Sequence, residues 1–320
     1  MVTLKQLAQL SGLSIRTVGR ALSGKGYVAA EKKALVQALA KQYNYTPNLA
    51  ARNLRLQQKK FVGIINTGYR FTANARKLAM LTRQLTAHGY WPLLGNAENL
   101  EICRNMLREW SAVAEYVVVL HNNNLPLLEF IAAETEKLQL KVIFVDCPDF
   151  SAKREIKVDR AGSVCRMLEE LAAMHFQHLV CCGMLPSRQN GIKSAQEKCL
   201  NMQITVIDAA PEFANGYTLG KTIMQTGADA VFFDTDRMAM GFYRYAAENN
   251  IRLPEDISVI GFDDEEFALF ATPALSTLAH PRQQIADNVI KMITGELQES
   301  PPVMTMDFIK RESLKNSMDS

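Results

Sequence analysis

A short polar stretch near the start of the chain has the chemistry needed to contact a base pair. It combines two guanidinium groups, two hydroxyl groups and one apolar side chain, carried by Ser14, Ile15, Arg16, Thr17 and Arg20. At the start of a helix in the major groove, a guanidinium commonly pairs with guanine, and small hydroxyl groups bind phosphate. Arg16 and Arg20 are therefore either base-contacting residues or two charges on an exposed helix.

The charge of the chain is divided very unevenly. The first 60 residues contain eleven Lys or Arg and a single acid, Glu31, so this segment carries +10. The remainder, with 25 basic and 32 acidic side chains, carries −7. A basic head on an acidic body is typical of proteins that bind a phosphate backbone, with a solvated basic arm as the alternative.

Residues with catalytic or metal-binding potential form no recognisable motif. The five histidines are scattered, and His175 and His178 have no third ligand nearby in the sequence. Neither Gly-x-Ser-x-Gly nor His-Glu-x-x-His is present. The acidic run at residues 263–266 could suggest acid–base work, but such a cluster more often accepts hydrogen bonds from ligand hydroxyls or stays solvated. We expect no enzyme activity, no metal and no cofactor.

One glycine pattern superficially matches a phosphate-binding loop. Gly19 and Gly24 precede Lys25 at the required spacing. Gly26 stands where Ser or Thr would hold magnesium, and a helix precedes the pattern in place of a strand. The pattern therefore does not indicate an ATPase.

Composition places the chain among soluble globular proteins. Its 320 residues are 48% hydrophobic and 22% charged, which is enough for two or three units with their own cores. No run of 18 apolar residues and no signal peptide is present, so we expect a cytoplasmic protein. Without Cys-x-x-Cys spacing, we expect reduced core thiols at Cys103, Cys147, Cys165, Cys181, Cys182 and Cys199.

Three short helices are predicted to hold the basic stretch in place. Thr3 is a plausible N-cap for residues 4–11, Ser14 caps the second helix, and Gly24 ends it. A tight turn at Gly12 joins these two helices, which is typical of a helix-turn-helix unit. The third helix covers about residues 30–42, and we expect its inward side chains to be Ala34, Leu35, Ala38 and Leu39.

The helix-turn-helix domain is predicted to cover residues 1–46 and to be followed by a hinge at 47–60. The sequence LAARNLRLQQKK is helix-prone but short and polar on several sides. Such a helix is marginal in water by itself, so we expect it to order only on binding.

Beyond residue 60, apolar strands alternate with helices. This alternation predicts a core of two doubly wound parallel-sheet subdomains, about 61–158 with 282–303 and about 159–281 with 304–313. Ligands bind such folds outside the carboxyl ends of the strands. The expected strands are 61–66, 90–95, 115–120, 141–146, 178–183, 202–208, 230–234, 257–263 and a final one within 304–313.

Both ends of the chain resemble the lactose-repressor (LacI-type) family of bacterial regulators. Residues 2–24, VTLKQLAQLSGLSIRTVGRALSG, resemble the family's VTLxDVAxxAGVSxxTVSRxLN. Downstream, DRMAMG (236–241), LPEDISVIGFDD (253–264) and TPALSTLAHP (272–281) resemble DxMAxG, VPxDISVxGFDD and PxLTTVxxP. The resemblance covers nearly the whole chain and implies a helix-turn-helix head joined to a core like the type I periplasmic binding proteins.

For the head, the resemblance implies contacts with a pseudo-palindromic DNA operator. Ile15, Arg16 and Arg20 would read the major groove, and Ala51 and Leu54 would belong to paired hinge helices in the minor groove. A leucine wedged into a base step kinks DNA and gains contact area. The remaining contacts, mainly to phosphate, would come from Thr3, Leu4, Ser14, Thr17, Tyr45 and Asn48.

For the core, the resemblance implies a small-molecule effector, sugar-like in character, bound between the two subdomains. Arginine and carboxylates can bracket a hydroxylated ligand through charge-assisted hydrogen bonds. Tyr69 and Phe71 would stack on a sugar face or else pack in the core. The other implied effector-binding residues are Asp146, Arg188, Thr235, Asp236, Asp263 and Asp264.

The sequence thus predicts a homodimeric transcription regulator, with repression as its expected action. A ligand-dependent activator or dual regulator is the alternative. A solute receptor without regulatory function fits less well because of the +10 head, and a nucleotide-dependent enzyme lacks a catalytic pair.

Overall fold

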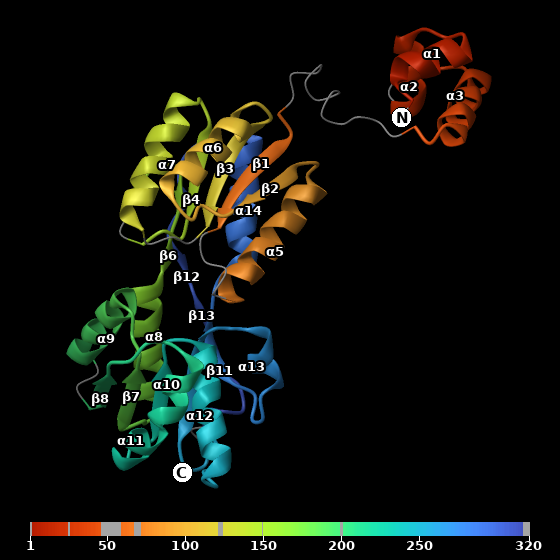
Figure 1. Ribbon diagram of the computed structural model, residues 1–320. Helices are drawn as coiled ribbons and strands as arrows, with labels where there is room; N and C mark the ends of the chain where they lie inside the picture. Colours follow the sequence, from red (N-terminus) through yellow and green to blue (C-terminus); the bar gives the residue numbers. More distant parts are fainter. Residues whose placement is uncertain are drawn as a thin grey trace. The chain divides into compact units, whose positions relative to one another are not determined.

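The computed structural model describes residues 2–24, 26–45, 59–66, 72–120, 124–148, 150–198 and 201–315, with side chains undescribed at 72 and 73. By its internal contacts the chain divides into two compact units, Met1–Lys60 and Phe61–Ser320 (Figure 1). The predicted hinge, including Asn48, Ala51 and Leu54, lies outside the described residues, as do Tyr69 and Phe71.

The first unit consists of three capped helices. At the start of the first, the Thr3 hydroxyl accepts a hydrogen bond from the Gln6 backbone, and the Gln6 side chain accepts one from the Thr3 backbone. Ser14 accepts from the Thr17 backbone at 3.1 Å, and Gly24 ends that helix with φ of 67°. Both predicted N-caps and the glycine stop are confirmed for α1 (Leu4–Ser11) and α2 (Ile15–Ser23), which precede α3 (Ala30–Gln42).

The packing of α3 differs from the sequence-based expectation. Ala34, Leu35 and Ala38 are exposed, and the exposed fraction of Leu35 is 45%. The prediction was therefore wrong for three of the four residues expected to face inward. The buried face is rotated by about one residue and centres on Val36, with Leu39 and Ala40 partly buried beside it. Positions i, i+3 and i+4 form this face, and it packs on a core of Leu7, Ala8, Val18 and Ala21.

A five-stranded parallel sheet organises the first half of the larger unit. Helices α5 and α14 pack on one face around Ile64 and Val118, and α6 and α7 pack on the other around Val117 and Val119. We call this part the first lobe. In sheet order its strands are β2 (Trp91–Gly95), β1 (Phe61–Asn66), β3 (Ala114–Leu120), β4 (Lys141–Val145) and β5 (Glu155–Ile156), and its helices are α5 (Thr72–Ala87), α6 (Leu100–Ser111), α7 (Leu125–Lys137) and α14 (Arg282–Thr294).

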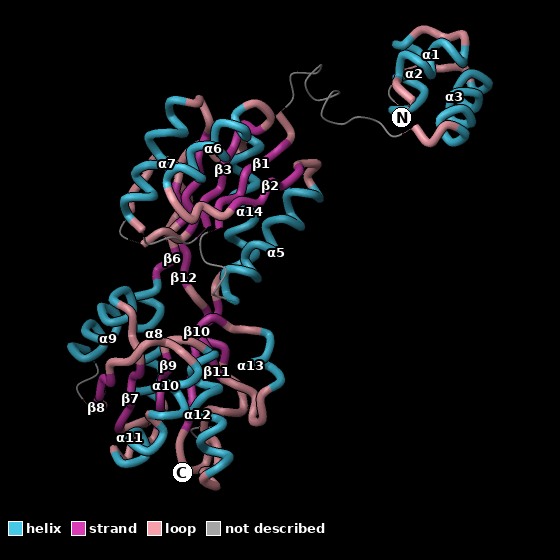
Figure 2. Tube along the Cα trace, in the orientation of Figure 1, coloured by secondary structure: helices cyan, strands magenta, loops and turns pink. Residues whose placement is uncertain are grey.

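A six-stranded sheet forms the second lobe. Its strands are β13 (Asp307–Ile309), β11 (Ser276–Ala279), β10 (Ser258–Asp263), β9 (Ala230–Phe233), β7 (His178–Cys182) and β8 (Gln203–Ile207). Its helices are α8 (Arg160–Ala173), α9 (Pro186–Lys198), α10 (Phe213–Thr218), α11 (Gly220–Gln225), α12 (Asp236–Glu248) and α13 (Glu266–Phe270). Figure 2 shows the alternation of helices and strands in both lobes.

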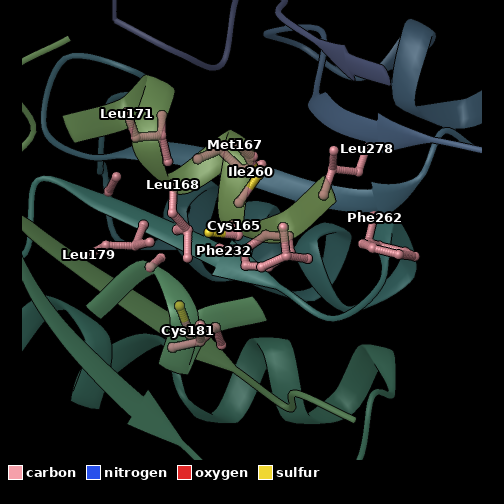
Figure 3. Close-up of a cluster of buried hydrophobic side chains, with 14 of the residues drawn as sticks. Cys165, Met167, Leu168, Leu171, Leu179, Cys181, Phe232, Ile260, Phe262 and Leu278 are labelled. Atoms are coloured by element: carbon pink, nitrogen blue, oxygen red, sulfur yellow. The ribbon is translucent and has the colours of Figure 1, made fainter. Parts of the chain in front are cut away.

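The core of the second lobe follows the period of two expected for strands. Leu168 and Leu171 of α8 pack against Phe232 and Ile260 on one face of the sheet (Figure 3). Adjacent Cys181 and Cys182 belong to the clusters on opposite faces. As predicted, the described cysteines are buried free thiols, namely Cys103, Cys147, Cys165, Cys181 and Cys182; Cys199 lies outside the described residues.

Three local predictions need correction. The C-terminal tail forms two short strands in place of one: β12 (Met304–Thr305) pairs with β6 (Val158–Asp159), and β13 pairs antiparallel with β11. An antiparallel edge strand needs no crossover helix, so helix–strand alternation does not reveal it. The alternation of strands and helices predicts one helix between β8 and β9, but two short helices, α10 and α11, lie there. Strand β11 and helix α14 were not predicted from the sequence pattern.

Within the described ranges, no helix combines the length and the apolar character needed to cross a membrane.

Candidate nucleic-acid interface and ligand site

The exposed face of α2 carries the residues predicted to read DNA. Val18 and Ala21 are buried in the head core, so the opposite side of the helix faces solvent. Arg16 and Arg20 are exposed, and the Ile15 side chain is 41% exposed. This face has the composition of a base-reading surface.

The residues predicted to bind phosphate divide into two groups. Thr3 and Ser14 are N-caps, so they place the positive ends of α1 and α2 beside them, and Ser14 Oγ lies 2.8 Å from Thr17 Oγ1. Leu4 and Tyr45 are partly buried and pack against the head core, which indicates a structural contribution for both.

In the larger unit, Asp146 links side chains from both lobes. It follows β4 directly, has a φ of 58°, and is buried. Its Oδ2 accepts from Lys77 Nζ and from Arg160 Nη2, each at 2.6 Å, and Arg160 Nη1 donates to Oδ1. Lys77 lies on α5 of the first lobe, and Arg160 begins α8 of the second. Burial lowers the pKa of Lys77, while the adjacent Asp146 carboxylate acts in the opposite direction.

Arg188 is a buried residue near the start of α9 in the second lobe. Its guanidinium carbon is 3.9 Å from the centroid of the Phe262 ring, and its Nε is 3.2 Å from Asp234 Oδ1 without hydrogen-bond geometry. Asp234 Oδ1 instead accepts from the Leu185 backbone at 3.0 Å. Burial lowers the pKa of Arg188 and raises that of Asp234, because it disfavours the charged form of each side chain.

Thr235 and Asp236 are already occupied by contacts within the second lobe. Thr235 Oγ1 accepts from the Met238 backbone and caps α12. Asp236 accepts from the Glu265 backbone at 2.7 Å and from Thr277 Oγ1 at 2.6 Å, and burial raises its pKa well above the usual range. These contacts join α12 to the ends of β10 and β11. Thr235 and Asp236 therefore position these elements relative to one another.

Asp263 and Asp264 end strand β10 in an uncommon backbone conformation. Their φ angles are 105° and 51°, a region that non-glycine residues rarely adopt and that is associated with functional sites. His280 Nε2 lies 3.2 Å from Asp263 Oδ1. Burial raises the pKa of Asp263 to about 6 and lowers that of His280 well below its usual value, so His280 is neutral.

Asp264 is surrounded by three arginines and joins the lobes a second time. Arg311 Nη2 donates to Asp264 Oδ1 at 2.6 Å, and Arg282 Nη1 lies 3.6 Å from Oδ2. Arg76 and Arg282 also donate to the Asp264 backbone carbonyl. Because Arg76 and Arg282 belong to α5 and α14 of the first lobe, these contacts hold the β10 end of the second lobe against it.

The raised pKa of Asp263 predicts how stability changes with pH. In the folded protein, the Asp263 carboxyl group keeps its proton up to about pH 6. In the unfolded chain, it loses the proton near pH 3.9. This contribution is therefore complete below about pH 4 and is lost as the pH rises through about 6. Relative to Asp263→Asn, the parent should lose up to about 3 kcal/mol of unfolding free energy across this window. Urea unfolding of the parent and of Asp263→Asn at about pH 4 and about pH 6 measures this loss. If the unfolding free energy of the parent relative to the variant stays constant or grows with pH, the raised pKa of Asp263 is contradicted.

Unpartnered buried atoms concentrate in the same region. Among the described residues, six buried side-chain nitrogens or oxygens have no hydrogen-bond partner, and they belong to Asn74, Arg188, Asp234, Glu265, His280 and Arg282. Each such group costs free energy unless a ligand, an ion or a water satisfies it, so their concentration makes this region the candidate ligand site. We call the following residues the polar cluster: Asn74, Arg76, Lys77, Asp146, Arg160, Arg188, Asp234, Asp236, Asp263, Asp264, Glu265, His280, Arg282 and Arg311.

Several members of the polar cluster were missed from the sequence. Asp234 ends a buried strand, AVFFD, directly before Thr235, and this position was a usable signal. Lys77 and Arg160 lie inside ordinary helical patterns, and His280 and Arg282 follow a strand that the pattern did not reveal. Only the tertiary arrangement brings these four side chains to Asp146 and Asp263.

Comparison with known proteins matches both units. Residues 3–48 match the family described as bacterial regulatory proteins, lacI family, and residues 168–314 match the periplasmic binding protein-like domain. The chain therefore combines a lacI-family helix-turn-helix domain with a periplasmic binding protein-like domain. The combined match covers the helix-turn-helix head and most of the second lobe, as the resemblance of both chain ends predicted.

Curated relatives are similar to this chain along most of its length. The HTH-type transcriptional repressor PurR of Salmonella arizonae is 28% identical, with 93% of this chain and 91% of the relative covered. The probable HTH-type transcriptional repressor ExuR of Bacillus subtilis is 25% identical, with 98% and 99% covered.

Solved structures confirm the fold. The lac repressor dimer bound to operator and the anti-inducer ONPF aligns with a TM-score of 0.81 at 20% identity, with 98% of each chain covered. A LacI family transcriptional regulator from Enterococcus faecium with bound ribose aligns with a TM-score of 0.68 at 20% identity, with 80% of this chain and 99% of that one covered. The predicted architecture, a helical head and two parallel-sheet α/β lobes, is confirmed.

Proposed function

We propose that this protein is a sequence-specific DNA-binding transcription repressor whose operator affinity is controlled by a small effector bound at the polar cluster. The observation that carries the proposal is the exposed face of α2, where Ile15, Arg16 and Arg20 face away from a packed core. The family match to bacterial regulatory proteins supports DNA as the partner of this face. Because it acts on bacterial DNA, we propose a cytoplasmic location.

The proposed functional unit is a homodimer on a pseudo-palindromic operator. A single helix-turn-helix head reads only a few base pairs, and two heads related by a two-fold axis read two half-sites. The lac repressor, similar in fold, is known as a dimer bound to operator.

Control of DNA binding is proposed to act through the contacts between the lobes. Asp146 with Arg160, and Asp264 with Arg76 and Arg282, connect the lobes through charged groups. A ligand that contacts Asp263 or Arg188 changes the balance of these interactions. The ligand then shifts the lobe arrangement by its differential affinity for the two states, and the hinge transmits the shift to the heads.

The proposal is tested by selecting duplexes from a random pool with the purified full chain. Recovery of a shared motif with two inverted half-sites supports a dimeric regulator. Recovery of unrelated duplexes at the frequency of the input pool would refute the proposal. Repression is then distinguished from activation by placing the recovered site upstream of a reporter: expression should fall when the protein is present, and a rise favours the activator alternative.

The hinge carries a separate prediction, inferred from the family resemblance. Leu54→Ala should weaken binding to the selected duplex by about tenfold or more, because an apolar wedge in the minor groove gains the contact area that offsets unstacking. Ligand binding, measured by thermal shift, should stay unchanged. Equal duplex affinity for parent and variant would count against a hinge wedge at this position.

We further propose that the protein is not an enzyme. The polar cluster contains carboxylates and a histidine, but Asp146 and Asp264 are paired with cations, and Asp236 is occupied by the Glu265 backbone. A turnover screen with the compounds that bind should detect no product, whereas conversion of a bound compound would identify a catalytic site.

A further inference from the structure

The chemical class of the effector can be inferred from which atoms of the polar cluster are already occupied. Both oxygens of Asp146 hold cationic donors, Lys77 at Oδ2 and Arg160 at both oxygens. A carboxylate engaged in this way is a poor acceptor for ligand hydroxyls. Around Asp146, two bound cations face one carboxylate, so this part of the cluster attracts negative charge.

Of the three unpartnered donors among the described residues, Asn74 Nδ2 and Arg188 Nε belong to this part of the cluster, whereas the third, Arg282 Nε, belongs to the arginine that contacts Asp264. Asn74 is 1% exposed and precedes Lys77 by one turn of α5, so both share a helix face; its Nδ2 has no partner. Arg188 is 6% exposed, its Nε also has no hydrogen-bond partner, and the charges of Arg160 and Asp146 both affect its pKa, which places it within electrostatic reach of them. Helices α5 and α8 begin here and add the partial positive charge of their N-termini.

Unpartnered acceptors belong to a different set of residues. His280 is neutral and its Nε2–H donates to Asp263, which leaves a lone pair on Nδ1. Asp234 Oδ2 and Glu265 Oε1 are the other two acceptors without partners. Hydroxyl groups of a ligand could donate to all three. Arg188 Nε lies 3.2 Å from Asp234 Oδ1 without hydrogen-bond geometry, so it leaves Asp234 Oδ2 unsatisfied.

We infer that the effector is a small polyhydroxylated molecule with one carboxylate group, which binds beside Asn74, Lys77 and Arg188 while its hydroxyls donate to Asp234, Glu265 and His280. The inference rests on the proposed function, namely that the polar cluster is the effector site. A single carboxylate fits better than a phosphate ester because Lys77 and Arg160 face only one carboxylate, Asp146, which leaves one excess positive charge there. A ligand with two negative charges would leave one of them uncompensated in a buried setting.

Matched ligands provide the test. Glucose, galactose and mannose are each compared with their aldonic acid, their uronic acid and their 6-phosphate. The affinity of the full chain for each compound is measured by isothermal titration calorimetry. We expect at least one sugar acid to bind at least tenfold more tightly than both its parent aldose and its phosphate ester. A neutral sugar or phosphate ester that binds as tightly as its acid overturns the inference, and so does a complete absence of binding by the acids.

A charge-removing variant tests the role of Lys77 in the same preference. Lys77→Met keeps the length of the buried side chain and removes its charge, so the advantage of the acid over the neutral sugar should fall by tenfold or more. Lys137→Met, on the exposed surface of α7, is the matched control and should keep the full preference. An undiminished preference in folded Lys77→Met contradicts the inference, and the ligand series on the parent protein remains decisive if the variant does not fold.

Binding to the selected duplex separates this inference from the proposed function. Release of the duplex by a neutral sugar, with no response to acids, would refute the carboxylate and leave the regulator intact. Failure to select any duplex would refute the regulator, whatever the ligands do.

Discussion

Replacing Arg16 and Arg20 together by alanine is expected to lower affinity for the selected duplex by about two to four powers of ten, because each base-contacting arginine contributes about 1–3 kcal/mol of discrimination. Both side chains are exposed, and neither belongs to the head core of Leu7, Val18 and Val36. The fold of the head should therefore survive, as measured by circular dichroism.

Binding to random duplex should fall much less, since it depends on the whole basic head through phosphate contacts. The control removes two charges elsewhere: Lys137→Ala with Lys198→Ala changes exposed residues of α7 and α9. This control should bind the selected duplex like the parent. If the arginine variant loses specific and random binding equally, the two arginines contact only phosphate.

Arg188→Met is expected to destabilise the larger unit by about 3–5 kcal/mol, because it leaves the buried Asp234 carboxylate without its cation. Adding Asp234→Asn removes that orphaned charge, and the amide oxygen can still accept from the Leu185 backbone. The double variant should recover more than half of the lost free energy of unfolding, measured by urea denaturation.

Ligand response distinguishes the two possible roles of Arg188. Both the single and the double variant should lose the rise in Tm that a bound acid produces in the parent, since both lack the guanidinium. A double variant that regains stability together with the ligand response would show that Arg188 only supports the fold. A single variant as stable as the parent would contradict the buried pairing itself.

The sequence predicted the general architecture because its strongest signals are local. Caps at Thr3 and Ser14 and the stop at Gly24 are formed by neighbouring residues, so they can be recognised without tertiary information. The buried strands of parallel sheets form continuous apolar runs, which also stand out. The sequence pattern predicted a strand in the C-terminal tail, but the antiparallel pairing of β13 and the inward face of α3 depend on packing partners, and the pattern did not reveal them.

The ligand site was only partly predictable for the same reason. Asp146, Arg188, Asp263 and Asp264 were predicted, and the structure brings them into one charged network. The sequence did not show that Asp146 is already bound by a lysine and an arginine, because Lys77 is 69 residues away from it. Thr235 and Asp236 were predicted as ligand contacts, and the structure shows them capping α12 and joining β10 to β11.

The most direct test of the central claim is an equilibrium competition between the selected duplex and a scrambled duplex of the same composition, at about 0.15 M salt. Specific regulators bind their sites about 10³-fold or more above random DNA, whereas phosphate binding alone gives no sequence preference. We predict a ratio of about 10³ or greater for the parent chain. A ratio near one would show that the basic head binds DNA without reading it.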